Sequence, residues 1–210
     1  MSWITAEISM KLSKFFNELL LTQMQDFSRA IHTFHYALMT QDLEGDMVEF
    51  GCFQGHTARI LACMLPNKKM YVYDSFEGTP VNDENMVAGL CETSFESFKE
   101  TFENEKLPLP IVKIGFFENL IHKDIPEKIC FAHLDANLYI STIDPLRLIY
   151  DRMTKGGIIL IDDCPDCPGI RCPGVQRACT EFFADKPEIP VNLPLLPGYD
   201  VPGKTLITKL

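Results

Sequence analysis

The sequence predicts an α/β fold built on a mostly parallel β-sheet. From residue 46 onward, short apolar runs alternate with amphipathic stretches of helical length. The runs are apolar throughout, which is typical of parallel strands that helices cover on both faces. Acidic residues follow most of the runs, at the edge of such a sheet where ligands usually bind. The alternation predicts the fold, and the acids predict where the functional site lies.

Length and charge narrow the class of protein. The 210 residues suffice for one domain with a sizeable core, and the 46% hydrophobic and 23% charged fractions are ordinary for a globular protein. The net charge of −10 argues against nucleic acid as a partner, because phosphates are bound by clustered Lys and Arg. No apolar run approaches the roughly 18 residues of a membrane span. The first residues lack the pattern of a secretory signal, so we expect a cytoplasmic protein.

Residues 1–45 precede the first expected strand and carry helical spacing. Two apolar stripes are visible there, namely Phe15, Phe16, Leu19 and Leu20, and then Phe27, Ile31, Phe34 and Leu38. This N-terminal helical segment is expected to pack against the core, to cover the site as a lid, or to form the contact of a homo-oligomer.

Residues 46–210 are expected to form one domain of strands and helices. The expected strands are 46–51, 69–74, 110–115, 128–135, 156–163, 189–193 and 204–210. The expected helices are 55–65, 93–104, 143–153 and 175–185. Thr93 and Glu96 have the spacing of a capping box at the start of the second helix. The last two strands are expected to pair as a hairpin.

The turn after the first strand, "EFGCFQGHTA", suggests a nucleoside ligand. Gly51 and Gly55 allow the backbone to approach a ligand closely, but the G-x-G-x-x-G dinucleotide fingerprint is missing. Asp74 ends the second strand and is placed to accept hydrogen bonds from ribose hydroxyls. A turn without the full phosphate cradle favours S-adenosylmethionine over NAD.

Three further acids follow the fourth and fifth strands. Asp135, Asp162 and Asp163 would repel one another unless a cation lies among them. Hard oxygen ligands at converging positions suit Mg²⁺, although capping and salt-bridge roles are the alternative.

The cysteines divide into two groups. Cys52, Cys63, Cys91 and Cys130 are expected to be small buried residues. The segment "CPDCPGIRCPG", with Cys164, Cys167 and Cys172, is compatible with zinc, with a disulfide or redox pair, or with a plain loop.

The ordered segments "MVEFGCFQGHTA", "YVYDSFEGTP", "IGFFENLI", "HLDANLYIST", "GGIILIDD" and "VQRACTEFF" resemble the motifs of a known family. This is the macrocin O-methyltransferase (TylF/MycF/NovP-type) family of class I S-adenosylmethionine-dependent methyltransferases, which methylate sugar hydroxyls. The resemblance runs from about residue 45 to 185. It implies a Rossmann-like fold with a seven-stranded sheet and helices on both faces, so that residues 46–210 are the methyltransferase domain.

The resemblance also implies a set of site residues. Cofactor contacts are implied for Glu49, Gly51, Asp74, Ser75, Gly115 and Phe116. A bound Mg²⁺ is implied at Asp135, Asp162 and Asp163. The implied reaction is methyl transfer to a hydroxyl of a sugar or another small-molecule acceptor.

Asn137 departs from the family pattern. The usual motif is Asp-x-Asp-Leu-Tyr, and its second Asp is thought to be the general base, whereas this chain reads Asp135-Ala136-Asn137. A neutral amide is not a useful proton acceptor. The acceptor is then an acidic hydroxyl, another base such as His133 or His56 serves, or methyl transfer is slow or lost. An S-adenosylmethionine-binding protein and an α/β enzyme of other chemistry, such as a dehydrogenase, are therefore the competing hypotheses.

Overall fold

The computed structural model describes residues 10, 13, 27–80, 87–164, 172–193 and 203–210. The first expected stripe, at residues 15–20, lies outside this part of the chain. The elements in chain order are α2 (Phe27–Met39), β1 (Asp46–Phe50), α3 (His56–Met64), β2 (Met70–Asp74), α4 (Phe95–Glu103), β3 (Ile111–Ile114), β4 (Ile129–Leu134), α5 (Tyr139–Ile149), β5 (Met153–Asp162), α6 (Pro173–Phe183), β6 (Val191–Leu193) and β7 (Lys204–Thr208). Within the described residues, no helix combines the length and apolarity that a membrane span needs.

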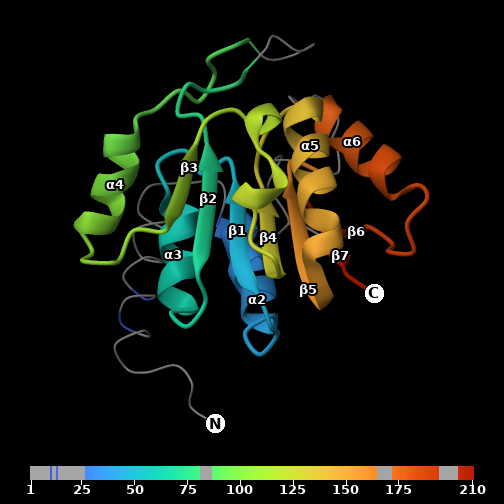
Figure 1. Cartoon of the computed structure of the whole chain (residues 1–210), viewed down its shortest axis with the longest axis horizontal. Coiled ribbons are helices and arrows are strands. Elements are labelled where there is room, and N and C mark those ends of the chain that lie inside the picture. Colours follow the sequence, from blue (N-terminus) through green and yellow to red (C-terminus); the bar gives the residue numbers. More distant parts are fainter. Residues whose placement is uncertain (1–9, 11–12, 14–26, 81–86, 165–171, 194–202) are drawn as a thin grey trace.

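The strands form one seven-stranded sheet in the order β3-β2-β1-β4-β5-β7-β6 (Figure 1). The five strands from β3 to β5 are parallel, and β7 runs antiparallel to both of its neighbours. This confirms the predicted fold class, a mostly parallel seven-stranded α/β fold. The expected pairing of the last two strands is also confirmed, because β6 and β7 are antiparallel neighbours.

Two hydrophobic cores lie on the two faces of the sheet. One contains residues of α2, α3 and α4, such as Phe34, Leu61 and Phe98. The other contains residues of α5 and α6, such as Leu146 and Val175. Alternating strand residues divide between the cores, since Met47 packs into the first and Val48 into the second. Helices on both faces therefore cover the central strands, which fixes ligand access at the ends of the strands.

Burial differs from the expectation in two places, the edge strand β3 and residue Ile31 of α2. β3 is exposed along most of its length because it is an edge strand, so it is not covered on both faces. On α2, Phe34 and Leu38 pack against the core as expected. Ile31 is 40% exposed, because the buried face of the helix runs through Thr33, Phe34 and Ala37.

Three local predictions were also wrong. The N-cap of α4 is Ser94, whose hydroxyl accepts a hydrogen bond from the N–H of Ser97, so Thr93 and Glu96 are not a capping box. Helix α5 begins four residues before the expected start, and Pro145 lies in its second turn. Cys91 is exposed, whereas Cys52, Cys63 and Cys130 are buried as predicted.

Candidate active site

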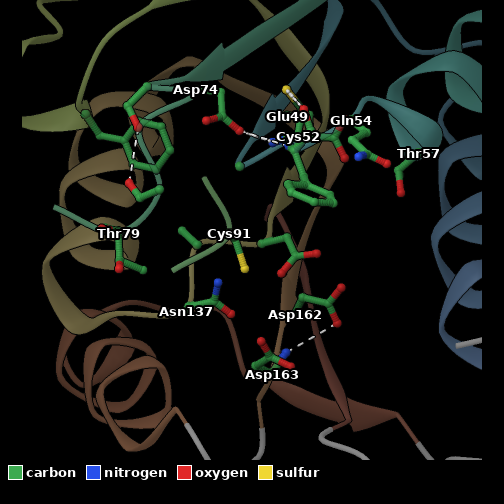
Figure 2. Close-up of a pocket in the computed structure, with 18 of the residues that line it drawn as sticks. Glu49, Cys52, Gln54, Thr57, Asp74, Thr79, Cys91, Asn137, Asp162 and Asp163 are labelled. Carbon is green, nitrogen blue, oxygen red and sulfur yellow. Dashed lines mark hydrogen bonds between the residues drawn. The ribbon is translucent and has the colours of Figure 1, made fainter. Parts of the chain in front are cut away.

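A cavity of about 560 Å³ opens at the carboxyl ends of the parallel strands. Its wall includes all but one of the predicted site residues, namely Glu49, Gly51, Asp74, Ser75, Phe116, Asp135, Asn137, Asp162 and Asp163. Gly115 is the exception and does not line the cavity. Glu49, Cys52, Gln54 and Asp74 lie along one side, and Asn137, Asp162 and Asp163 lie along the other (Figure 2).

Asp74 at the end of β2 organises the turn that follows β1. Its Oδ2 accepts hydrogen bonds from the N–H groups of Cys52 at 2.8 Å and Phe53 at 2.9 Å, and its Oδ1 accepts one from Phe76 at 2.8 Å. Phe53 and Phe76 both have positive φ, which non-glycine residues adopt only when the surroundings hold them there. Asp74 therefore shapes the turn as well as lining the cavity, a structural role that its position in the sequence did not reveal.

Gly51 is required by a close approach between two chain segments. A Cβ at Gly51 would lie 1.9 Å from the backbone oxygen of Asp135, and Gly51 has φ +80°. The N–H of Asp135 in turn donates to the carbonyl of Phe50 at 2.9 Å. These contacts bring the ends of β1 and β4 together, so that the two predicted halves of the site share one cavity.

Ser75 and Gly115 support neighbouring turns. The hydroxyl of Ser75 donates to the carbonyl of Gly78 at 3.2 Å and accepts from the N–H of Glu77 at 3.1 Å. The N–H of Gly115 donates to the carbonyl of Asp74 at 2.9 Å. Gly115 therefore positions Phe116 at the cavity wall through its backbone.

Glu49 carries a buried oxygen without a partner. Its side chain is 1% exposed, and Oε1 lies 2.8 Å from Nδ1 of His133, its register neighbour on β4. Among the residues that the structure describes, Oε2 has no hydrogen-bond partner. A buried carboxylate oxygen without a partner is costly, so the cavity beside it suits a ligand that is cationic or donates hydrogen bonds.

Lys204 is the site residue that sequence reasoning missed. It is the first residue of β7, is 2% exposed, and lies opposite Asp162 in the register of β5 and β7. Its Nζ lies 2.5 Å from Oδ2 of Asp162 and 3.2 Å from Nε2 of His133. An ammonium only donates and an ionised carboxylate only accepts, so these contacts assign the His133 proton to Nδ1. The available signal was a lysine at the first position of an expected strand, KTLIT.

Two of the three predicted Mg²⁺ ligands, Asp135 and Asp162, lie close together, and His133 joins them. Within the described residues, the group able to share an ion consists of His133, Asp135 and Asp162, whose ligand atoms lie within 4.8 Å of one another. Asp163 is not in this group. Lys204 Nζ already occupies the space between Asp162 and His133, so their present arrangement does not fit a divalent ion held between them.

Asn137 and Asp163 approach the same thiol. Sγ of Cys172 lies 3.8 Å from Oδ1 of Asn137 and 3.6 Å from Oδ2 of Asp163. Asn137 and Asp163 both have positive φ, at 63° and 57°, in the left-handed region that Asn and Asp tolerate best. The amide that departs from the family pattern therefore lies beside a carboxylate on the same wall of the cavity.

The other candidate bases and nucleophiles are placed differently. His133 is buried behind the cavity, between Glu49 and Lys204, whereas His56 lines the cavity. Burial raises the pKa of the Cys52 thiol, and Asp74 raises it further. Cys91 is exposed, but partial desolvation and then the charges of Asp135 and Asp74 raise the pKa of its thiol too, so neither cysteine is a thiolate nucleophile. Cys164 and Cys172 are buried thiols, and Cys167 lies outside the described residues.

Sequence relatives of this chain are O-methyltransferases. Over 147 residues it is 26% identical to demethyldecarbamoylnovobiocin O-methyltransferase of Streptomyces niveus, a match that covers 60% of this chain and 56% of that one. Over 144 residues it is 26% identical to 8-demethyl-8-(2,3-dimethoxy-alpha-L-rhamnosyl)-tetracenomycin-C 4'-O-methyltransferase of Streptomyces olivaceus, covering 60% and 55%. The matched region thus spans about half the length of these relatives.

Solved structures share the fold. The O-methyltransferase NovP has a TM-score of 0.73 at 20% identity, covering 87% of this chain and 80% of that chain. The O-methyltransferase TomG of Streptomyces achromogenes, solved in complex with S-adenosylmethionine, has a TM-score of 0.63 at 15% identity, covering 94% of this chain and 88% of that chain.

The family model for macrocin-O-methyltransferase (TylF) matches residues 21–190. Because this match covers most of the 210 residues, the chain belongs to the macrocin-O-methyltransferase (TylF) family of enzymes.

Proposed function

We propose that this chain transfers a methyl group from S-adenosylmethionine to a hydroxyl oxygen of a sugar or another small molecule. The sequence relatives are named for small-molecule acceptors, demethyldecarbamoylnovobiocin and a rhamnosyl-tetracenomycin. Within the cavity, the observation that carries the proposal is the unpartnered Oε2 of Glu49. S-adenosylmethionine bears an ammonium and a sulfonium group, and either would compensate this buried negative charge.

The residues around Glu49 fit the rest of the cofactor. Asp74 retains acceptor capacity on Oδ1 beyond the hydrogen bond from Phe76, which suits a ribose hydroxyl. Gly51 keeps the turn close to the end of β4, and Phe116 offers an apolar ring at the cavity wall. When bound, S-adenosylmethionine supplies an electrophilic methyl group. The protein contributes the positions of the two reactants and excludes water from between them.

The acceptor hydroxyl needs a proton acceptor other than Asn137. We assign this role to Asp163, a carboxylate that lines the cavity on the same side as Asn137. Asp162 is less suited, because the Lys204 ammonium is hydrogen-bonded to it and stabilises its ionised form. Asp163→Asn should therefore lower kcat by about 10² to 10⁴ without changing cofactor affinity.

Magnesium dependence, which the family resemblance implies, stays a prediction. Asp135, Asp162 and Asp163 would be the ligands, but the ammonium of Lys204 is hydrogen-bonded to Asp162. The proposed function therefore derives no step from a metal ion.

Calorimetry with S-adenosylhomocysteine tests cofactor binding. Glu49→Gln should weaken binding by about 1.5 to 3 kcal/mol, the range for one hydrogen bond to a charged group. Glu44→Gln is the matched control, because Glu44 is exposed and pairs with Lys128 away from the cavity. Tighter binding of NAD than of S-adenosylhomocysteine would refute the proposal and favour a dehydrogenase.

Mass analysis of products from a panel of hydroxylated acceptors tests catalysis. A mass gain of one methyl group is the expected result. Asn137 favours one alternative, an S-adenosylmethionine-binding protein in which methyl transfer is reduced or lost. Cofactor binding with no methylated product from any sugar, phenol or simple alcohol would support that alternative.

A further inference from the structure

Lys204 forms a buried chain of charged and polar groups with three other residues. In spatial order these are Glu49, His133, Lys204 and Asp162, contributed by β1, β4, β7 and β5. All four side chains are at least nine-tenths buried, and Glu49, Asp162 and Lys204 also line the cavity. The two sheet registers, Glu49 opposite His133 and Asp162 opposite Lys204, create this arrangement.

The ammonium of Lys204 occupies the location that a divalent ion shared by Asp162 and His133 would need. Oδ2 of Asp162 and Nε2 of His133 are 3.5 Å apart, and Nζ lies 2.5 Å and 3.2 Å from them. An ion at its usual distance of about 2.1 Å from both atoms could be no farther than about 3.5 Å from Nζ. Two cations at that distance in a buried site repel strongly, and Nζ is already hydrogen-bonded to both ligand atoms.

We infer that Lys204 supplies the positive charge within the group formed by Glu49, His133, Lys204 and Asp162, and that this charge excludes a divalent ion from the group. Of the acids that the sequence presents as a magnesium site, Asp162 is thus neutralised by a residue of the same chain. Two of the three N–H donors of Lys204 bond to Asp162 and His133, and the third is available to a polar group in the cavity. If the proposed function holds, methyl transfer by this chain therefore uses no divalent ion shared by Asp162 and His133.

Binding of Mn²⁺, followed by electron paramagnetic resonance of the free ion, tests this inference without turnover. Wild-type protein should bind no stoichiometric Mn²⁺ at concentrations up to about 1 mM, a weak limit for protein metal sites. Lys204→Gln keeps a donor for Asp162 but removes the charge, so it should bind one Mn²⁺ at least about tenfold more tightly than wild type. Lys113→Gln is the control, because Lys113 also pairs with an aspartate, Asp124 at 2.9 Å, but lies on the edge strand β3. It should behave like wild type.

One equivalent of Mn²⁺ bound by wild type as tightly as by Lys204→Gln would overturn the inference. So would the absence of Mn²⁺ binding by folded Lys204→Gln, since the lysine would then not be excluding an ion. Lys204→Met serves as a second uncharged variant if Lys204→Gln does not fold, and the wild-type measurement can refute the inference by itself. Titration of the same proteins with S-adenosylhomocysteine tests the proposed function separately, so failure of one can be told from failure of the other.

Discussion

At the scale of single residues, Asn137 is where the chain departs most clearly from its family pattern. Its left-handed backbone, with φ 63°, is a conformation that both Asn and Asp adopt more readily than most residues, so exchange between the two should leave the local fold intact. The change between them keeps the shape of the side chain but alters its charge, its hydrogen-bond donors and its ability to accept a proton.

Because Asp163 already serves as the proposed base, Asn137→Asp alone should change the rate on plain alcohols little. In the Asp163→Asn background, Asn137→Asp should raise that rate by up to about 10² to 10⁴, because it restores a general base. Rates should be compared across acceptors of graded pKa, and the gain should shrink as the hydroxyl becomes more acidic. The double variant Asn137→Asp with Asp163→Asn should recover activity that Asp163→Asn loses. A double variant as slow as Asp163→Asn, with normal cofactor affinity, would mean that position 137 does not face the reacting oxygen.

Gly51 offers a second test at this scale, with a matched glycine as its control. Gly51→Ala should lower the free energy of unfolding by about 1 to 3 kcal/mol more than Gly89→Ala, because its new Cβ meets the backbone of Asp135. Gly89 has nearly the same φ, +79°, but a Cβ there meets nothing within 4 Å, so backbone strain is equal in the two variants. Chemical denaturation measures the difference. Equal losses would show that the close approach between β1 and β4 is not rigid.

At the scale of elements, the turn between β1 and α3 depends on the end of β2. Asp74 accepts hydrogen bonds from three backbone N–H groups, two of which belong to that turn. Its carboxylate therefore fixes the turn after β1 relative to the end of β2. Helix α3 then begins after Gly55, whose left-handed conformation ends the turn. Binding residues on this turn are thus pre-ordered before any ligand arrives.

Asp74→Ala should weaken binding of S-adenosylhomocysteine by about 1.5 to 3 kcal/mol, because it removes a ligand contact and loosens the turn. Asp46→Ala is the control, since Asp46 accepts a backbone N–H from Lys69 at the opposite end of the sheet. Isothermal titration calorimetry gives both affinities. Unchanged affinity in a folded Asp74→Ala protein would remove Asp74 from the site.

At the scale of the whole molecule, Glu188 connects the last two residues, Lys209 and Leu210, to Tyr150, which directly follows α5. Its carboxylate accepts from Tyr150 Oη at 2.6 Å, from Lys209 Nζ at 2.8 Å and from the N–H of Leu210 at 3.3 Å. Burial raises the pKa of Glu188, but the hydrogen bonds from Lys209 and Tyr150 lower it more, to about 2. The folded state therefore favours the ionised form.

A lowered folded-state pKa stabilises the protein above the unfolded pKa of 4.5, and this stability is lost as the pH falls toward about 2. Glu188→Gln should cost about 3 kcal/mol of unfolding free energy at pH 7. The difference from wild type should shrink between pH 4.5 and pH 2. Denaturant titrations at several pH values measure it, with Asp185→Asn, an exposed ion-pair residue, as the control. A difference that is independent of pH would contradict the assignment.

Much of the fold could be predicted from the sequence because its signals are local. The apolar runs ending at Phe50, Asp74 and Leu134 became strands with nearly the expected bounds, since burial on both faces demands continuous apolar residues. The start of α5 and the cap of α4 were misplaced, because several neighbouring residues can begin a helix and packing selects among them. The exposure of β3 depends on its place in the sheet order, which is not a local property.

The sequence by itself determined that acids and glycines at strand ends would form one site, because the carboxyl ends of parallel strands meet at the same edge of a sheet. Only the tertiary structure decided what those acids face. Lys204 is 42 residues from Asp162 in the chain, and the antiparallel register of β7 places the two directly opposite each other. Strand register is set by packing across the whole sheet, so only the folded sheet places the ammonium of Lys204 beside the carboxylate of Asp162.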